Sequence, residues 1–275
     1  MKIILGIDIG GSTTKIIGLK PDGALISTMM VRAYDQLTSL YGALGNYTDT
    51  NGFSLHDVEK IFITGVGASY IHGDIYGIPT VRIEEFSATA RGGLALAHAK
   101  EAVVVSMGTG TAFIHAKAKE YMHIGGSGVG GGMLMGLGRV LTGSSDFETI
   151  CSLADGGDLR NVDLTVGDIS KQDIETLGMD ITAANFANIR DYATDKDMAL
   201  GLINVVLQTI ITMSAFACRG LSVNTVILTG ALTQLRKLPE IIDMCRSIYP
   251  INFIIPENAM FATAVGAALH FGDHK

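Results

Sequence analysis

The chain has 275 residues, of which 48% are hydrophobic, so it can bury a substantial core in one large domain or two lobes. Its net charge of −7 argues against a general nucleic-acid binder, which normally carries a basic face. The three cysteines, Cys151, Cys218 and Cys245, are far apart and lack metal-ligand spacing, so we expect reduced, mostly buried thiols in a cytoplasmic protein. No signal peptide and no run of about 18 uncharged apolar residues is evident, so we expect no membrane association.

The opening of the chain predicts an antiparallel meander. Three apolar strands, over 3–9, 14–19 and 24–31, are joined by a glycine-rich turn and by the turn Pro21-Asp-Gly23. The elements expected next are a helix over 37–47, a helical turn from Ser54 to Val58, a strand over 60–65, a segment over 75–83 that becomes strand-like, and a helix over 84–99.

A second apolar strand, over 102–106, ends in the glycine–hydroxyl turn 107–111 and continues as a strand over 112–116. This repeats the plan of the opening. We therefore divide the chain into an N-terminal lobe, 1–100, and a C-terminal lobe, 101–275.

The C-terminal lobe is expected to contain one helix much longer than the rest. That helix, over 196–220, is apolar on more than one face, which predicts burial by the core or by a second subunit. The other expected elements are a strand-like piece over 121–124, helices over 133–142 and 145–153, a loop over 154–163, an extended piece over 164–169, a helix over 183–191 capped by Thr182, a strand over 225–228, a helix over 238–247, a strand over 252–255 and a helix over 259–270.

The first strand stops at an acid and a turn suited to a phosphate group. Asp8 would hold hydrated magnesium, since Mg²⁺ prefers one or two carboxylates plus phosphate oxygens. Glycine lets backbone N–H groups approach an anion closely. The turn residues expected to meet the phosphates are Gly10, Gly11, Ser12, Thr13 and Lys15. Taken alone, the motif is also compatible with a plain hairpin turn.

Later glycine turns strengthen the nucleotide hypothesis. A second turn follows the strand over 102–106, a third follows the strand over 225–228, and a glycine-rich stretch, 125–132, too rich in glycine to be a packing element, opens a helix. The second turn and the helix start contribute Gly108, Thr109, Gly110, Thr111, Gly130, Gly131 and Gly132, and the third turn contributes Gly230. Two turns on facing lobes would clamp the phosphates of ATP, with Gly230 beneath the adenosine. The chain has no Gly-x4-Gly-Lys-Ser/Thr motif, which argues against a P-loop NTPase.

This arrangement resembles the actin, Hsp70 and sugar-kinase superfamily, and within it the type II pantothenate kinases. The stretches that carry the resemblance are Gly6-Ile-Asp-Ile-Gly-Gly-Ser-Thr, Thr64-Gly65, Glu85-Phe86, Gly108-Thr-Gly-Thr, the glycine-rich stretch 125–132 with Gly136-Leu137, Asp163-Leu164, Thr182-Ala-Ala-Asn-Phe186, Glu257-Asn258 and Gly266-Ala267. The resemblance implies a two-lobed α/β fold of the actin-like ATPase (ribonuclease H-like) type, with mixed sheets flanked by helices and the nucleotide in the cleft between the lobes.

The resemblance further implies ATP- and Mg²⁺-dependent phosphorylation of pantothenate, the first step of coenzyme A synthesis. Glu85 matches the family's catalytic acid, which would accept the proton of the attacking hydroxyl. From spacing alone, Glu84 and Glu85 are simply acids at a helix N-terminus, and Glu84 keeps that interpretation. The substrate-binding residues expected are Glu85, Gly108, Thr109, His123 and Gly125.

His123 is a departure from the family pattern. The family usually has arginine two residues before the glycine-rich stretch, and histidine is shorter, mostly neutral near pH 7 and unable to form a bidentate fork. Three readings follow: His123 acts weakly in the arginine's place, Arg91, Arg82 or Arg139 substitutes for it, or the acceptor is not pantothenate. A partly exposed strand histidine without a role is a fourth.

The same motifs are compatible with other functions. A kinase of another small hydroxyl compound, an ATPase that drives a partner, such as the activators of radical dehydratases, and a nucleotide-binding regulatory protein are the alternatives. The activators place cysteines for an iron–sulfur cluster between two subunits, and this chain has no cysteine pair near a glycine turn. The resemblance also implies a homodimer built on the 196–220 helix, and feedback by coenzyme A thioesters that varies among family members.

Overall fold

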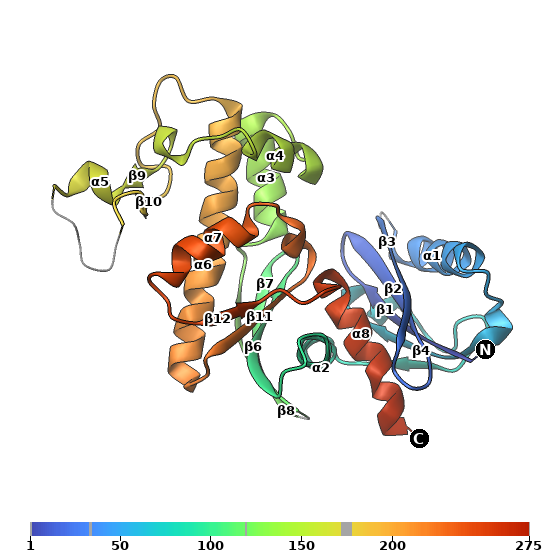
Figure 1. Cartoon of the computed structure of the whole chain (residues 1–275). Coiled ribbons are helices and arrows are strands. Elements are labelled where there is room, and N and C mark those ends of the chain that lie inside the picture. The colour runs from blue at the N-terminus through green and yellow to red at the C-terminus, as the bar shows by residue number, and fades with distance from the viewer. Residues whose placement is uncertain (1, 33–34, 119, 172–177, 275) are drawn as a thin grey trace.

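Two five-stranded mixed sheets, each covered by helices, form the two halves of the molecule (Figure 1). The computed structural model describes residues 2–32, 35–118, 120–171 and 178–274. The predicted α/β architecture of two mixed sheets flanked by helices is confirmed.

The first sheet contains the predicted meander and two parallel strands. Its strands, in spatial order, are β3 (Leu25–Arg32), β2 (Thr13–Leu19), β1 (Ile3–Ile9), β4 (Val58–Thr64) and β5 (Thr80–Arg82). The first three are antiparallel neighbours, and β4 and β5 continue the sheet in parallel with β1. All seven residues of β1 are buried, as expected for a central strand with both faces covered.

The second sheet repeats this topology. Its strands, in the corresponding order, are β8 (Glu120–Ser127), β7 (Thr111–Lys117), β6 (Glu101–Met107), β11 (Thr225–Thr229) and β12 (Asn252–Ile254). Again three antiparallel strands are followed by two parallel ones. The repeat that the strand–turn–strand pattern predicted therefore extends to whole sheets.

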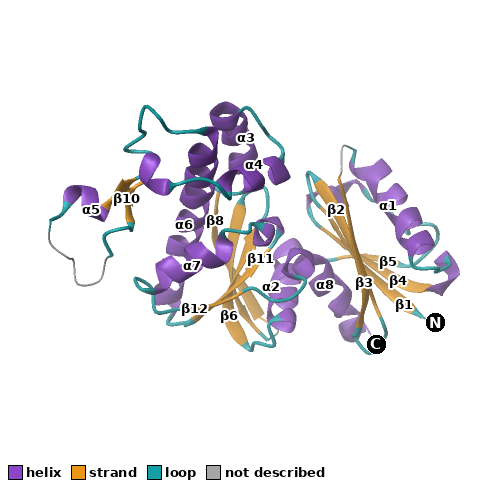
Figure 2. Cartoon of the chain, turned by 45° about the horizontal axis from the view of Figure 1, so that its top comes forward, coloured by secondary structure: helices purple, strands orange, loops and turns teal. Residues whose placement is uncertain are grey.

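Two helices lie side by side between the sheets: α2 (Glu85–Leu96) and α8 (Ala262–Leu269) (Figures 1 and 2). A Cβ at Gly92 of α2 would lie 1.8 Å from the Ala262 carbonyl oxygen, and one at Gly266 of α8 would lie 1.7 Å from that of Ala88. Only glycine permits this close crossing.

Each of these helices packs on the sheet of the other half. In α2, Leu94 and Ala90 pack with Val104 of the second sheet, whereas in α8, Ala264 packs with Phe62 of the first. The proposed division at residue 100 remains a prediction, because it assigns each helix to the half whose sheet it does not cover.

The outer face of each sheet is covered by other helices. On the first sheet this is α1 (Gln36–Thr50), whose buried residues Leu40, Ala43, Leu44 and Tyr47 follow helical spacing. The second sheet is covered by α3 (Gly131–Thr142), α4 (Phe147–Ala154), α6 (Asp195–Leu221) and α7 (Leu238–Arg246). Short 3₁₀ helices complete the chain: η1 (Leu55–Asp57), η2 (Val66–Tyr70), η3 (Leu159–Asn161), η4 (Ala231–Gln234), η5 (Ala259–Phe261) and η6 (His270–His274).

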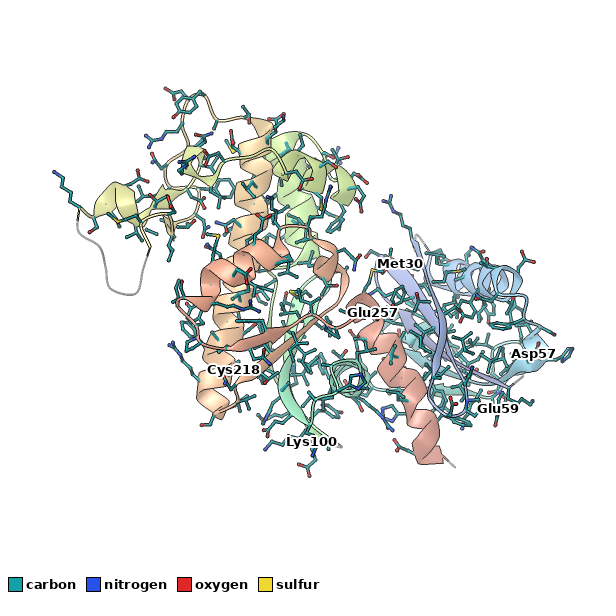
Figure 3. The ribbon with its side chains drawn as sticks, viewed as in Figure 1. Met30, Asp57, Glu59, Lys100, Cys218 and Glu257 are labelled. Atoms are coloured by element: carbon teal, nitrogen blue, oxygen red, sulfur yellow. The ribbon has the colours of Figure 1, made fainter. Side chains whose placement is uncertain are left out.

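The long helix α6 meets the length and composition of a membrane span, so our statement that no such stretch is evident was wrong. Of its most apolar 18-residue window, 61% is buried inside the protein. Its buried side chains, including Leu202, Val206 and Ile210, pack on the core of the second sheet, which is where Figure 3 places Cys218 as well. Its apolar character thus has a structural explanation within the fold.

Two sequence predictions failed between α4 and α6. The piece expected to be extended over 164–169 is a two-residue strand, β9 (Leu164–Thr165), followed by the helical turn α5 (Val166–Ile169). The helix expected over 183–191 is instead the strand β10 (Thr182–Ala184) and a series of turns. β10 pairs with β9.

The cause of the second failure is a fully buried carboxylate, Asp163. Rather than capping a helix, the Thr182 hydroxyl donates to Asp163 Oδ2 at 2.9 Å, and the Phe186 N–H donates to Oδ1 at 2.9 Å. Asn204 of α6 also donates its amide to Oδ2, at 2.9 Å. The segment is bent around the acid, and the donors compensate the cost of burying its charge.

Candidate functional site

The site begins with an ion pair at the end of β1. Asp8 and Lys15 occupy directly opposite positions on β1 and β2, with Lys15 Nζ 3.5 Å from Asp8 Oδ2. Each residue is only 9% exposed. Burying two opposite charges together avoids the larger cost of burying either alone.

The neighbouring strand β4 closes the other side of Asp8. Thr64 is the parallel partner of Asp8, and Gly65, with φ at +87°, follows it. A Cβ on Gly65 would lie 2.6 Å from Asp8 Oδ1, so only glycine allows the backbone to approach this carboxylate. Lys15, Asp8 and Thr64 therefore form a row across three strands on the face that Ile4, Ile17 and Phe62 share with α8.

The turn between β1 and β2 offers backbone donors. The Gly10 N–H is used within the turn, where it donates to the Thr13 carbonyl at 2.9 Å. Within the described ranges, the N–H groups of Gly11 and Ser12 have no protein acceptor, and both residues are exposed. These two amides can receive an anion.

The glycine-rich stretch packs against the second turn, so our inference that it is too rich in glycine for packing was wrong. Gly131 and Gly132, at the start of α3, donate their N–H groups to the carbonyls of Gly108 and Thr109, both at 2.8 Å. A Cβ at Gly130 would lie 2.7 Å from the Thr109 oxygen. Two of the first N–H groups of α3 are thus already paired, and an anion would have to use other donors there.

The donors that stay open at the second turn are those of Thr109 and Gly110. In the described part of the chain neither N–H has a protein acceptor, whereas Gly108 N–H donates to the Gly110 carbonyl at 2.9 Å. The Thr111 hydroxyl donates to the Val129 carbonyl at 2.8 Å and so ties the turn to the glycine-rich stretch.

Gly230 joins this group from β11. Its φ is +90°, and a Cβ there would lie 2.6 Å from the Met107 carbonyl, directly before the second turn. Its N–H donates to the Ala259 carbonyl at 3.1 Å, which connects it to the chain that enters α8. The second and third turns are therefore neighbours in space, as the sequence-based hypothesis requires.

Glu84 and Glu85 separate into two roles at the start of α2. Glu84 is the N-cap, with its carboxylate accepting from the N–H groups of Phe86 at 3.0 Å and Ser87 at 2.6 Å. The interpretation of Glu84 as a helix-end acid is confirmed. Glu85 makes no such contact among the described residues and is free to act on the site.

Electrostatics connect Glu85 to the ion pair. Burial raises the pKa of Glu85, the negative charges of Asp8 and Glu84 raise it further, and Lys15 partly offsets them. A half-buried carboxylate with a raised pKa, within electrostatic reach of Asp8 and Lys15, is suited to general-base chemistry.

His123 lies beside the residue that follows Glu85. Its ring stacks on Phe86, with centroids 4.1 Å apart and planes inclined by 7°. Two residues earlier on β8, Tyr121 lies near Glu84, and burial together with this acid raises the pKa of the Tyr121 hydroxyl. Residues two apart on a strand share a face, so Tyr121 and His123 together hold β8 against the start of α2.

A β-bulge at Ile124 separates His123 from Gly125. The partner of His123 on β7 is Ile114, and the partner of Gly125 is Phe113, so the strand carries one extra residue here. Bulges re-aim neighbouring side chains and are common next to active sites. Sequence reasoning identified His123 and Gly125 as site residues. It named Thr64 and Phe86 only within stretches that carry the family resemblance and gave them no role, and it missed Tyr121, for which the aromatic ring two residues before His123 was the available signal.

The three arginines considered as substitutes lie elsewhere. Arg91 pairs with Asp273 and lies 3.3 Å from His270 Nδ1. It lines a pocket of about 760 Å³ between α2, the start of β8 and η6. Arg82 is exposed on β5, and Arg139 is exposed in the last turn of α3. Among these cations and Lys15, Lys15 is the one whose charge acts on Glu85.

The residues around Asp8 fit a hydrated magnesium ion. Mg²⁺ keeps several waters and binds through one or two carboxylates and phosphate oxygens, so a dedicated cluster of ligands is not required. The described residues contain no such cluster. Beside Asp8, the Thr64 hydroxyl is a buried polar atom that no group of the described chain satisfies.

Cysteine chemistry finds no support at the site. Cys151, Cys218 and Cys245 are buried, free thiols. Burial raises the pKa of each to about 11, so they are not thiolates near neutral pH.

Known proteins resemble the chain in sequence and in fold. The Fumble family model matches residues 97–251, and the BadF/BadG/BcrA/BcrD ATPase family model matches residues 5–134. A type II pantothenate kinase of Staphylococcus haemolyticus is 30% identical over 96% of this chain and 98% of its own length. One from Staphylococcus aureus (strain USA300) is 27% identical over 96% and 97%.

Solved structures with the same fold include nucleotide complexes. The activator of 2-hydroxyisocaproyl-CoA dehydratase from Clostridium difficile, with bound ADPNP, aligns with a TM-score of 0.70 at 16% identity, over 99% of this chain and 95% of its own. A ROK family glucokinase from Streptomyces griseus, in complex with glucose and AMPPNP, aligns with a TM-score of 0.59 at 12% identity, over 97% and 98%. At these identities the likeness concerns the fold, which is that of the actin-like ATPases and sugar kinases. The near full-length sequence match goes further, and the chain belongs to the type II pantothenate kinase family.

Proposed function

We propose that this protein transfers the γ-phosphoryl group of ATP to the terminal hydroxyl of pantothenate, in the cytoplasm. Family membership supports the reaction, and one observation on the chain itself carries it. Burial raises the pKa of Glu85, and the charges of Asp8 and Lys15, which pair at the first glycine turn, act on it in opposite directions. The proposed base is thus within electrostatic reach of the charges that would bind phosphate, an arrangement that suits phosphoryl transfer.

The nucleotide would bind between the two glycine turns. The unpaired amides of Gly11 and Ser12 on one side, and of Thr109 and Gly110 on the other, are donors for phosphate oxygens. The hydroxyls of Ser12 and Thr13 and the Lys15 ammonium add to the first turn. The second turn ends at Thr111, packs on Gly130–Gly132 and lies near Gly230, the position assigned to the adenosine.

Asp8 would hold magnesium through its carboxylate. Magnesium, when bound with ATP, would neutralise charge on the phosphoryl oxygens. Lys15 now lies 3.5 Å from Asp8 Oδ2, and we expect its ammonium to turn to the phosphates when the nucleotide binds. Glu85 would accept the proton of the pantothenate hydroxyl as that oxygen attacks phosphorus.

The acceptor would lie along β8 at the start of α2. His123, held by its stack on Phe86, offers a ring N–H to an acidic or polar group of the acceptor. Gly108, Thr109 and Gly125 complete the substrate-binding set that the family resemblance implies. An imidazole makes one hydrogen bond where a guanidinium makes two, so we expect weaker acceptor binding than in family members with arginine.

We also propose a homodimer formed through α6. Phe216 of α6 is 58% exposed, and its ring meets that of Tyr249 edge-on with centroids 6.3 Å apart. Arg219 lies over the same tyrosine, 5.6 Å from the ring centroid. An exposed aromatic cluster of this kind suits a subunit interface. Sedimentation of the wild type and of Phe216→Glu tests it, with a dimer expected only for the wild type.

Coenzyme A thioesters are proposed as feedback ligands, to be tested by inhibition of the purified kinase.

An ATP-consumption screen distinguishes this function from its alternatives. Pantothenate, pantetheine, N-substituted pantothenamides, hexosamines and a reaction without acceptor are compared. We expect turnover with pantothenate or its amides that depends on Glu85. Turnover with a hexosamine alone would indicate a kinase of another hydroxyl compound, and turnover without any acceptor would indicate an ATPase.

A further inference from the structure

The two sheets contain the same threonine–glycine pair at the same place. Thr64 and Thr229 end the parallel strands β4 and β11, and each is followed by a glycine with φ near +90° and a 3₁₀ helix. In the strand registers Thr64 pairs with Asp8, and Thr229 pairs with Ser106. Both threonines are fully buried.

Their hydroxyl groups nevertheless differ. Thr229 Oγ1 donates to the Val105 carbonyl at 3.0 Å. Thr64 Oγ1 has no partner among the residues that the structure describes. A buried hydroxyl without a hydrogen bond destabilises a fold, and native proteins rarely retain one without a reason. The second sheet shows that a backbone acceptor is within reach of this position.

The surroundings of Thr64 supply a reason. Neighbouring strands lie about 4.8 Å apart, so a threonine and an aspartate at paired positions on one face can form a direct hydrogen bond after a side-chain rotation. Lys15 meets Asp8 from the opposite strand, at a distance longer than that of a strong charge-assisted bond. Asp8 thus has the Lys15 ammonium beside it, and the Thr64 hydroxyl is a second donor that could reach it.

We propose that Thr64 is a positioning residue whose hydroxyl donates to the Asp8 carboxylate once Lys15 has left it for the nucleotide phosphates. The bond replaces the lost contact and orients Asp8 toward the metal ion. No covalent step is involved. The proposal rests on the nucleotide and metal part of the proposed function and is independent of which acceptor is phosphorylated.

Metal affinity provides the first test. Mn²⁺ binding is measured by electron paramagnetic resonance in the presence of a non-hydrolysable ATP analogue. Thr64→Val, which keeps the shape and removes the hydroxyl, should raise the dissociation constant of Mn²⁺ about fivefold, the effect of losing one ordinary hydrogen bond. Thr64→Ser, which keeps the hydroxyl, should stay within about twofold of the wild type.

Thermal stability without nucleotide provides the second test, with Thr229→Val as the matched control. Thr229→Val removes a hydrogen bond and should lower the melting temperature by about 2–4 °C, whereas Thr64→Val removes none and should not lower it. Equal destabilisation by both substitutions would show that Thr64 is bonded to the backbone in solution and would overturn the proposal. Unchanged Mn²⁺ affinity in Thr64→Val would overturn it as well.

The same experiment separates this inference from the proposed function. If the wild type binds Mn²⁺ with the nucleotide but does not phosphorylate pantothenate, only the acceptor is wrong, and the behaviour of Thr64→Val still decides the inference. If the wild type binds no Mn²⁺ with the nucleotide, both the nucleotide function and the inference are wrong.

Discussion

The two sheets share one topology but differ at their inner strand ends. In the first sheet, Lys15, Asp8 and Thr64 stand in a row, and the corresponding positions of the second sheet are Ala112, Ser106 and Thr229. The first sheet has charges and an unpaired hydroxyl where the second has small, uncharged or bonded side chains. In the proposed function, the first half would provide the charges for catalysis, and the second half would provide packed backbone groups that bind the nucleotide.

The turns show the same division. Thr14 and Thr111 occupy equivalent positions after the two turns, opposite Ile9 and Met107. Thr111 bonds to Val129, where the start of α3 docks, whereas the Thr14 hydroxyl has no partner in the described chain. The start of α3 thus packs on the second turn, whereas the N–H groups of Gly11 and Ser12 in the first turn have no protein acceptor among the described residues.

The largest effect is expected from removing the proposed general base, Glu85. Glu85→Ala should lower kcat for pantothenate phosphorylation by about 10²–10⁴-fold, because the general base is lost, and should leave nucleotide binding largely intact. Steady-state kinetics and a nucleotide-binding titration measure the two quantities. Glu84→Ala is the matched control: it should cost about 1 kcal/mol of stability through the lost N-cap and retain most of kcat. Full activity of Glu85→Ala would remove the assignment of the base.

The second prediction concerns the close packing of α2 against α8, between the two halves. Gly92→Ala places a methyl group against the Ala262 carbonyl and should destabilise the protein by about 1–3 kcal/mol, measured by thermal unfolding. Gly136→Ala, in an exposed part of α3 with nothing near its Cβ, should be neutral or stabilising by up to about 1 kcal/mol. Equal effects of the two substitutions would contradict the tight crossing of α2 and α8.

A substitution at His123 tests how β8 contributes to binding of the acceptor. His123→Arg should raise kcat/KM for pantothenate about tenfold, since a guanidinium forms a bidentate, charge-assisted contact with a carboxylate. His72→Arg, in an exposed loop, makes the same change in charge and should have no effect. No gain at His123 would leave the acceptor charge to another group.

The smallest effect concerns the pKa of Glu85. Because the pKa of Glu85 is raised in the fold, its carboxylate becomes protonated at a higher pH than an ordinary carboxyl group. As the pH is lowered, kcat/KM should therefore begin to fall at a higher pH than an ordinary carboxyl group would give. Glu84→Gln removes a negative neighbour and should move this acid limb to lower pH.

The raised pKa of Glu85 also predicts the direction in which a substitution changes the free energy of unfolding. The ionised form is disfavoured in the fold, so Glu85→Gln should stabilise the protein at neutral pH.

The stability gain of Glu85→Gln should also depend on pH in a defined direction. Below the unfolded-state pKa both states are protonated, so the gain should disappear as the pH falls through the raised pKa toward that value. Thermal unfolding at several pH values measures it. A gain that grows toward acid pH would mean that the pKa of Glu85 is lowered rather than raised.

Much of the fold could be predicted because its signals are local. The strand over 3–9, the turn at Gly10 and their repetition near Gly108 are visible as apolar runs that stop at glycine. The candidate residues Asp8, Lys15 and Glu85 follow from the same pattern together with the family resemblance. The helix expected after Thr182 failed, because propensity cannot show that Asp163, distant in the chain, accepts the Thr182 hydroxyl.

The sequence by itself determined the strands, the glycine turns and the family, since periodicity and backbone freedom are properties of neighbouring residues. Only the tertiary structure decided that α2 packs on the second sheet and α8 on the first, and that His123 stacks on Phe86. It also decided that the Thr229 hydroxyl forms a hydrogen bond, whereas the Thr64 hydroxyl has no partner among the described residues. These features depend on contacts between segments that the chain brings together only when it folds.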